Sequence, residues 1–246
     1  MKILSGYVTD VGRKRKLNED SYVVNDSIGL YAVADGMGGH SCGEVASKTA
    51  TDMLGSMMEV SHKKGTLAKD PLNALTEAIK VANTAVYEMS RKLGPGRSMG
   101  TTIAAVAGVN GKIFAAHVGD SRIYKMSSGK IEQIMRDHSL VEEQVARGLI
   151  TAEQAKTATN KNVITRALGL KEPVEIDTAK IDVAPGDYVL ICSDGLNGLV
   201  GDDEILKIST ADPSLSPEMA AMYLVEKANN NGGDDNITVV LLKFVK

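Results

Sequence analysis

The sequence predicts an α+β fold in which antiparallel β-sheets are covered by helices. Helical segments and hairpins occur in blocks, without the strict strand–helix–strand alternation of a parallel sheet. Asn110-Gly111 separates two apolar runs, and this dipeptide is the strongest short hairpin signal because both residues accept positive φ. The 246 residues are 43% hydrophobic and contain no obvious linker or repeat, so we expect one domain over residues 1–246.

The first half of the chain contains three early strands and two long helices. Residues 3–8, 21–25 and 28–34 have the apolar composition of strands. Residues 43–58 show helical spacing, with one apolar face formed by Val45, Ala46, Thr49, Met53 and Met57. The second helix, over 71–93, begins at Asp70-Pro71, an N-cap residue followed by proline at the first helical position, and ends before Gly94.

The second half begins with hairpins and ends with two helices and a strand. Apolar runs predict one hairpin over 101–109 and 112–118 and another over 122–126 and 130–134. The polar stretch 136–165 is predicted to be a surface excursion from the main fold, with short helices at 140–147 and 151–158. The remaining expected elements are strands at 187–192 and 237–244 and helices at 202–208 and 216–230.

Composition argues against a nucleic-acid-binding, disulfide-stabilised or membrane-spanning protein. The net charge of −3 gives no basic footprint for nucleic acid. Two cysteines do not form a disulfide framework, and Cys192 lies in an apolar run typical of a buried strand. No stretch resembles a signal peptide or reaches transmembrane length, so we expect a soluble cytoplasmic protein without a membrane partner.

Five short acidic clusters, far apart in the chain, contain the candidate functional residues. Three of them follow apolar runs that read as buried strands, where a carboxylate is costly to desolvate unless something compensates its charge. If the clusters meet in space, they form an oxygen-rich pocket for Mg²⁺ or Mn²⁺. The clusters are Asn18-Glu19-Asp20, Asp35-Gly36-Met37-Gly38-Gly39, Gly119-Asp120-Ser121-Arg122, Ser193-Asp194-Gly195 and Gly233-Asp234-Asp235-Asn236.

Each cluster also has a simple structural interpretation. Taken alone, every one of them is compatible with a polar turn, and Asp120 could pair locally with Arg122. The one basic block, Arg13-Lys14-Arg15-Lys16, could be a solvated turn or could place an arginine facing the acidic pocket. Only the joint occurrence of the clusters, in this order, favours a metal site.

The order and spacing of these motifs resemble the metal-dependent serine/threonine protein phosphatases (PPM, or type 2C), in their compact bacterial form. The resemblance covers about residues 5–243 and includes Arg15-x-x-Asn18-Glu19-Asp20, Gly100-Thr101-Thr102 and Asp235-Asn236-Ile237-Thr238. It implies a four-layer α-β-β-α sandwich, in which two antiparallel sheets are flanked by helix pairs. It also implies two tightly bound Mn²⁺ or Mg²⁺ ions, a third weaker one, and a mobile flap at 136–165.

The resemblance also implies roles for individual residues. Asp35 would bridge the two tight metals, with Asp194 and Asp235 on the first. The second would be held by the Gly36 carbonyl and, directly or through water, by Glu19 and Asp20. The third site would use Asp120 together with Asp194, Arg15 would bind the substrate phosphate, and Asn236 would support the ligands. Arg15, Asp35 and Asp194 are accordingly the expected catalytic residues.

One position departs from the family pattern. Members from higher organisms have a histidine directly after Asp-Gly, proposed as the acid that protonates the leaving alkoxide, and here that place is Met37. His40 is the nearest candidate, although it could equally be an ordinary surface histidine. The general acid therefore remains open between His40 and an unassigned group.

The expected function is hydrolysis of phosphoserine and phosphothreonine in proteins by a metal-activated water. The expected partners are phosphoprotein substrates, among them a bacterial Ser/Thr kinase and its targets, and the expected state is a monomer. The alternative is a dedicated partner-switch phosphatase in stress signalling. A calcium-binding module without activity would need Asp-x-Asp-x-Asp-Gly loops or a short repeat, and the sequence has neither.

Other phosphatase chemistries lack their motifs. A cysteine phosphatase needs Cys-x5-Arg, but Lys48 and Gly198 stand at the sixth positions after the two cysteines. An aspartyl-phosphate enzyme needs Asp-x-Asp, and calcineurin-like metallophosphatases use Asn-His ligands. The sequence contains neither pattern.

Overall fold

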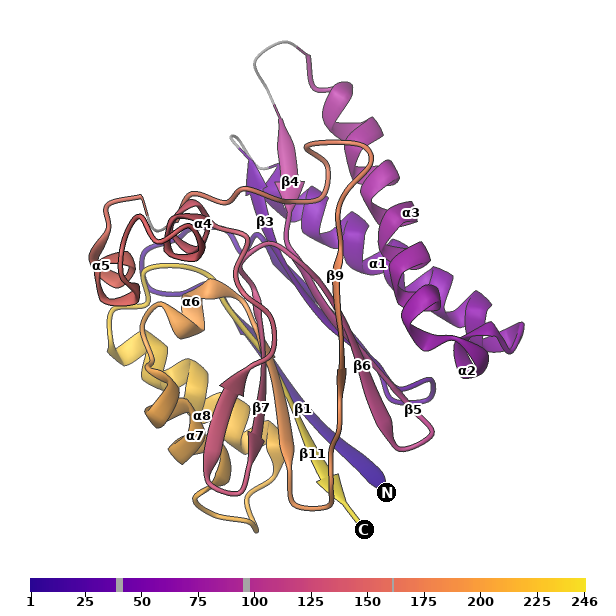
Figure 1. The fold of residues 1–246 in the computed structure, drawn as a ribbon, viewed down its shortest axis with the longest axis vertical. Helices are drawn as coiled ribbons and strands as arrows, with labels where there is room; N and C mark the ends of the chain where they lie inside the picture. The colour runs from indigo at the N-terminus through magenta and orange to yellow at the C-terminus, as the bar shows by residue number, and fades with distance from the viewer. Residues whose placement is uncertain (39–41, 95–97, 161) are drawn as a thin grey trace.

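Two antiparallel β-sheets lie face to face, with helices on their outer surfaces (Figure 1). The structure is a computed structural model that describes residues 1–38, 42–94, 98–160 and 162–246. The four layers agree with the predicted α-β-β-α sandwich.

The first sheet joins the two ends of the chain. Its strand order is β1-β11-β10-β7-β8, and all of its pairings are antiparallel. Its strands are β1 (Lys2–Asp10), β11 (Ile237–Val245), β10 (Tyr188–Cys192), β7 (Arg122–Ser127) and β8 (Lys130–Gln133).

The second sheet has the order β2-β3-β5-β6-β9, and short β4 pairs with the end of β3. Asn110 and Gly111, at φ 51° and 76°, make the predicted hairpin turn between β5 and β6. The strands are β2 (Asp20–Asn25), β3 (Leu30–Gly38), β4 (Met99–Thr101), β5 (Ile103–Val109), β6 (Lys112–Val118) and β9 (Asp177–Ile181).

Helices cover both outer faces. The second sheet packs against α1 (Gly43–Lys63) and α3 (Pro71–Arg91), which are joined by α2 (Thr66–Lys69). The first sheet packs against α8 (Pro217–Asn230), with α6 (Asp194–Asn197) and α7 (Asp202–Thr210) beside it. Separate apolar clusters lie under each helix layer, and a third lies between the sheets, so burial of apolar surface fixes all four layers.

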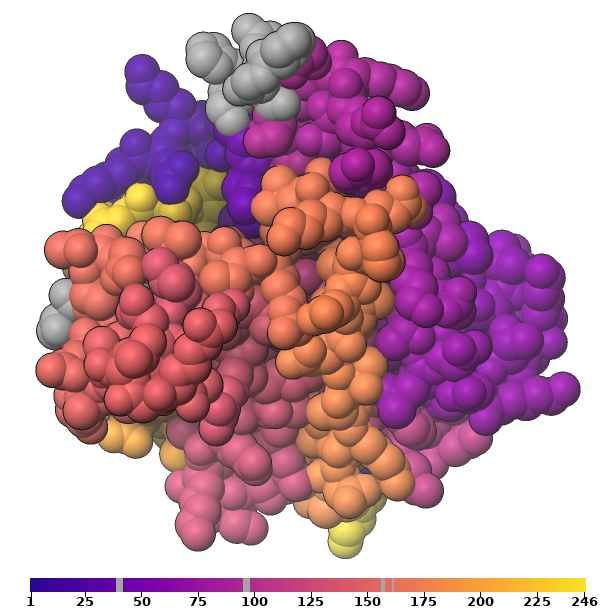
Figure 2. Space-filling model, turned by 45° about the horizontal axis from the view of Figure 1, so that its top comes forward, coloured from indigo at the N-terminus to yellow at the C-terminus, as the bar shows by residue number. Residues whose placement is uncertain are grey.

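The segment between β8 and β9 leaves the sandwich. It carries α4 (Leu140–Ala146) and α5 (Ala152–Thr157), as predicted for 140–147 and 151–158. Ser139 forms an isolated β-bridge with Ile164, which closes the excursion at its base. In Figure 2 this flap, coloured red to salmon, forms a lobe beside the orange segment that leads to β9.

Four short elements were absent from the sequence expectations: β4, β9, α2 and α6. β9 is an edge strand in which only Ile181 is buried, so its composition gave little signal. The first long helix also continues past residue 58 to Lys63, because no glycine or proline occurs between residue 58 and Gly65, which has φ of 71°. In the described ranges, no helix combines the length and apolarity needed to cross a membrane.

Candidate metal centre

The five acidic clusters come together at the end of the two sheets that carries α4 and α6 (Figure 1). Asp20 begins β2 and is the cross-strand partner of Asp35 in β3. Asp120 lies where the chain passes from β6 in one sheet to β7 in the other. Asp194 is the first residue of α6, directly after β10, and Asp235 lies just before β11. The topology therefore brings carboxylates from both sheets to one end.

Hydrogen bonds across the sandwich fix the Asp20 carboxylate. Its Oδ2 accepts hydrogen bonds from the hydroxyls of Ser193 and Thr238, both at 2.7 Å. Thr238 lies in β11 of the first sheet and Ser193 directly follows β10 of that sheet, whereas Asp20 belongs to the second sheet. The other oxygen, Oδ1, is buried without a hydrogen-bond partner in the described part of the chain. One oxygen of Asp20 is therefore held in place while the other is left available for a ligand.

The backbone around Asp35 is equally constrained. The Asp35 N–H donates to the Thr102 hydroxyl at 2.9 Å, and the Asp35 carbonyl accepts from the Thr102 N–H at 2.9 Å. Gly36 follows at a point where backbone segments crowd together. An added Cβ there would lie 2.1 Å from the Gly43 carbonyl oxygen and 2.4 Å from that of Glu19. Glycine is therefore required at this position.

Burial and mutual repulsion raise the pKa values of these carboxyl groups. Burial, opposed by the two hydroxyls, raises the pKa of Asp20 to about 7. Burial and then the charge of Asp194 raise the pKa of Asp120 to about 8. The pKa of Asp35 rises well above its usual range through burial and then the charges of the neighbouring aspartates. The cluster therefore cannot be fully ionised near neutral pH without added positive charge.

The donor set fits hard divalent cations. Its members are oxygens, and the Oδ1 atoms of Asp20, Asp120 and Asp194 are all buried without a hydrogen-bond partner in the described ranges. Mg²⁺ and Mn²⁺ prefer such carboxylate and carbonyl ligands. Among the described residues, no group of three or more Asp, Glu, His or Cys side chains is arranged so that it could hold a metal ion as it stands. The side chains of Asp35 and Asp194 instead interact directly with each other, which opposes the rise that burial causes in the pKa of Asp194.

The loop that carries Arg15 docks onto the Asp235 loop. The Arg13 N–H donates to the Gly233 carbonyl at 2.7 Å, and the Arg15 Nη2 lies 2.6 Å from Asp235 Oδ2. The Arg15 side chain is still 47% exposed, so its guanidinium is accessible to a ligand. The basic block is thus not simply a solvated turn: one of its arginines reaches the acidic site.

Asn236 and Glu19 organise the same region. The Asn236 amide donates to the carbonyls of Val11 and Leu17, both at 2.9 Å, and its Oδ1 accepts from the Glu19 N–H at 2.8 Å. These bonds hold the 11–19 loop against the start of β11. The Glu19 carboxylate lies at the N-terminus of α1, beside Gly43, and burial raises its pKa.

The local pairing of Asp120 with Arg122 is wrong. Arg122 instead forms a bidentate ion pair with Asp137, in which Nε and Nη2 approach the carboxylate oxygens at 2.7–3.0 Å. Asp120 lines a pocket of about 820 Å³ between the flap and α7, which Asp194 also lines. Since its Oδ1 has no partner among the described residues, Asp120 is available as a ligand.

The sequence matches a protein family over most of its length. The family model described as "Protein phosphatase 2C" matches residues 12–236. The chain belongs to the protein phosphatase 2C family. The protein phosphatase PhpP of Streptococcus pneumoniae is 35% identical over 244 residues, which cover 96% of each chain. The chain is therefore a protein serine/threonine phosphatase.

Solved structures of phosphatases share the fold. The serine/threonine phosphatase PstP/Ppp of Mycobacterium tuberculosis superposes with a TM-score of 0.89 at 33% identity, covering 100% of both chains. A structure of the PstP catalytic domain in complex with two manganese ions has a TM-score of 0.84 at 33% identity, again covering both chains completely. Divalent metal use by this protein phosphatase 2C member accords with its oxygen-only donor set.

The place of the histidine found in family members from higher organisms is Met37, which pairs with Gly100 between β3 and β4. His40 lies outside the residues that the structure describes. The general acid of this protein phosphatase 2C member therefore stays open.

Three hydroxyl residues of the site had no predicted role. Ser193 and Thr238 bind the Asp20 carboxylate, and Thr102 binds the backbone of Asp35. Each lies within a motif that the sequence analysis had recognised, and this position in the motif was the only available signal. Their partners lie far away in the sequence, so the hydrogen bonds themselves had no sequence signature.

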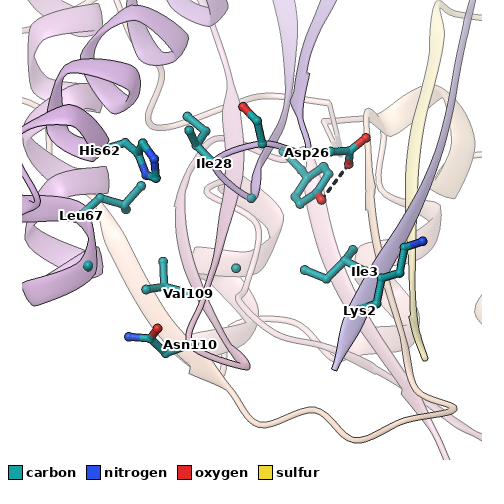
Figure 3. A pocket seen from close by; sticks show the side chains of 13 residues that line it. Lys2, Ile3, Asp26, Ile28, His62, Leu67, Val109 and Asn110 are labelled. Atoms are coloured by element: carbon teal, nitrogen blue, oxygen red, sulfur yellow. Dashed lines mark hydrogen bonds between the residues drawn. The ribbon is translucent and has the colours of Figure 1, made fainter. Parts of the chain in front are cut away.

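A second hollow, of about 500 Å³, lies at the opposite end of the sheets, near the start of β1 and the β5–β6 turn (Figure 3). Its Asp26 is already engaged, accepting hydrogen bonds from the hydroxyls of Tyr31 and Ser5 at 2.9 Å. The other labelled side chains are mostly apolar, with Lys2 and His62 at its rim. This hollow is separate from the phosphatase site.

Proposed function

We propose that the carboxylates of this chain hold a binuclear Mn²⁺ or Mg²⁺ centre that hydrolyses phosphoserine and phosphothreonine in proteins. Asp35, Asp194 and Asp235 would hold the first ion, and Asp35, Asp20 and the Gly36 carbonyl would hold the second. Glu19, held at the start of α1, would serve the second ion directly or through water. The observation that carries this assignment is that the buried Oδ1 atoms of Asp20 and Asp194 have no hydrogen-bond partner among the described residues, in a cluster of carboxyl groups with raised pKa values.

Two bound cations would supply a water of lowered pKa and would offset the negative charge of the phosphoryl group. The residues of the chain do the remaining work. Ser193 and Thr238 fix Asp20, and Asn236 holds the loop that carries Glu19. Arg15 leaves Asp235 and binds the phosphate oxygens, which orients the ester for in-line attack. No side chain has to form a covalent bond with the phosphoryl group.

A third, weaker ion is proposed at Asp120 with Asp194. Both side chains line the same pocket, and each has a buried Oδ1 without a partner among the described residues. Ser139 and Glu142 of the flap segment also line this pocket.

The proposed setting is a cytoplasmic monomer, folded as one domain over residues 1–246 with its flap at 136–165. Its substrates are phosphoproteins, among them a Ser/Thr kinase and its targets. The relative PhpP, named a protein phosphatase, and the serine/threonine phosphatase PstP/Ppp support phosphoprotein substrates for this chain.

The first prediction concerns metal dependence and substrate range. Initial rates on a panel of phosphothreonine and phosphoserine peptides should fall below ~1% in EDTA and recover with Mn²⁺ or Mg²⁺, because the charge of the carboxylate cluster then has a counterion. Ca²⁺, which tolerates looser geometry, should support much less turnover. Full activity in chelator after exhaustive dialysis would contradict the metal mechanism. Turnover of one phosphoprotein and none of the peptides would favour the partner-switch alternative.

The second prediction concerns Arg15. Arg15→Ala should raise KM for a phosphopeptide ~10-fold with a smaller change in kcat, because the guanidinium offers a planar fork to the phosphate. Arg13→Ala, Lys14→Ala and Lys16→Ala are matched controls from the same loop, and Lys14 is already paired with Asp234 at 2.7 Å. Equal effects of all four substitutions would instead indicate a diffuse basic surface.

A further inference from the structure

His138 contacts the turn that presents Asp120 through both its backbone and its ring. The His138 N–H donates to the Gly119 carbonyl at 2.7 Å. The Gly119 N–H donates in return to Nδ1 of the His138 ring at 3.1 Å. His138 is only 7% exposed, so this reciprocal pair is shielded from water. Both backbone polar groups of Gly119 are thereby bound by one residue.

The turn depends on such support because Gly119 has no side chain to pack. Its φ of +115° lies in the region that favours glycine, and an added Cβ would lie 2.5 Å from Thr102 Cγ2. Asp120 follows directly and is 7% exposed, with an Oδ1 that has no hydrogen-bond partner among the described residues. The orientation of that carboxylate therefore depends on how firmly the preceding glycine is held.

A second carboxylate orients the His138 ring. Because Nδ1 accepts from Gly119, the proton of the neutral ring resides on Nε2, which lies 3.2 Å from Asp177 Oδ2 in β9. The other Asp177 oxygen is bound by Arg166 Nη1 at 3.0 Å. The buried His117 ring packs against His138, with 4.7 Å between ring centroids. The ring of His138 is thus fixed in tautomer and rotation from the side away from the pocket.

We propose that His138, oriented by Asp177, is a positioning residue that holds the Gly119 turn so that Asp120 keeps its carboxylate in the metal pocket. This inference rests on the proposed function in one respect, because it takes Asp120 as a metal ligand. Residues that orient ligands in this way typically contribute 10–100-fold to metal affinity or activity. His138 does not touch the substrate or a metal ion.

The test compares five variants of the full chain: His138→Ala, His138→Asn, Asp177→Ala, Asp120→Ala and, as a distant histidine control, the exposed His62→Ala. Mn²⁺ titrations followed by electron paramagnetic resonance of the free ion give the affinity of the weakest site. Steady-state rates on one phosphothreonine peptide give kcat and KM, and thermal melts give the folded fraction. The peptide and Mn²⁺ alone serve as probes.

His138→Ala should weaken the weakest Mn²⁺ site ~10-fold and lower kcat by a similar factor at limiting Mn²⁺, with KM within about twofold. His138→Asn should recover most of both, because the asparagine Oδ1 can take the place of Nδ1 as acceptor for the Gly119 N–H. Asp177→Ala should have an intermediate effect, and His62→Ala should match the wild-type protein.

The outcomes distinguish the role of Asp120 as a metal ligand from the role of His138 as a positioning residue. If Asp120→Ala changes neither the weakest Mn²⁺ site nor kcat, the assignment of Asp120 as a ligand fails, and this inference fails with it. If Asp120→Ala removes that site but His138→Ala and Asp177→Ala leave its affinity per folded molecule unchanged, only the positioning role is overturned. A His138→Asn variant as defective as His138→Ala would also overturn it, since the acceptor role would then be refuted.

Discussion

Asp35→Ala should lower phosphopeptide turnover by at least ~100-fold, even at saturating Mn²⁺. The pKa of Asp35 is raised by burial and then by the charges of Asp20, Asp194, Asp120 and Asp235, so this aspartate interacts with carboxylates from both sheets. In the proposed centre it is the one side chain that touches both tight ions. A loss of ~100-fold corresponds to about 2.7 kcal/mol of transition-state stabilisation, within the range expected for removal of a group that stabilises developing charge.

The fold should tolerate this change. Removing a buried carboxyl from a crowded acidic cluster relieves repulsion, so the melting temperature of the metal-free variant should not fall appreciably below that of the wild-type protein. The rise in melting temperature on adding Mn²⁺ should shrink, because that rise reports binding to the native state. Asp52→Ala, on the exposed face of α1, is a matched control that should behave like wild type. An Asp35→Ala enzyme with at least half of wild-type turnover and an unchanged Mn²⁺ response would refute the bridging role.

Asp194→Ala should have an effect of similar size, at least ~100-fold in turnover. Asp194 begins α6, interacts with Asp35 and lines the pocket with Asp120, so its loss should affect both the first tight site and the proposed weak site. Its Oδ1 has no hydrogen-bond partner in the described ranges, so this oxygen is available as a ligand. The measurement is kcat over a wide range of Mn²⁺ concentration.

A suitable control for this variant is Asp202→Ala, which removes an exposed carboxylate at the start of α7 in the same pocket wall. Its turnover should stay within about twofold of wild type, because its charge is solvated. Near-normal turnover of Asp194→Ala at saturating Mn²⁺ would show that the first metal is held by other groups.

The sequence was most informative where local patterns decide structure. Asn110-Gly111 predicted its hairpin because that turn needs two residues that accept positive φ, and Asp70-Pro71 predicted the start of α3 because each suits its place at a helix N-terminus. The side chain of Asp70 indeed accepts a hydrogen bond from the Asn73 N–H at 3.1 Å. The weakly patterned edge strand β9 was missed, because its stability comes from pairing with β6.

The candidate site could be predicted in outline but not in its supporting contacts. The acidic clusters were recognisable because buried strands ending in aspartate are costly without a ligand, and the motif order identified the family. The contacts of Thr238 with Asp20 and of His138 with Gly119 join residues 218 and 19 positions apart. Such bonds depend on how the sheets pack, so a single sequence contains no local signal for them. The pairing of Arg122 with Asp137 rather than Asp120 is the same kind of result.

The most direct test of the account is anomalous scattering from a crystal of the full chain soaked in Mn²⁺. The proposed binuclear centre predicts two strong manganese peaks at the end of the sheets, with Asp35 between them. Asp194 and Asp235 should lie within coordination distance of one peak, and Asp20 and the Gly36 carbonyl within coordination distance of the other. A third, weaker peak should appear beside Asp120. Strong peaks elsewhere, with none within coordination distance of Asp35 at saturating Mn²⁺, would contradict the binuclear centre.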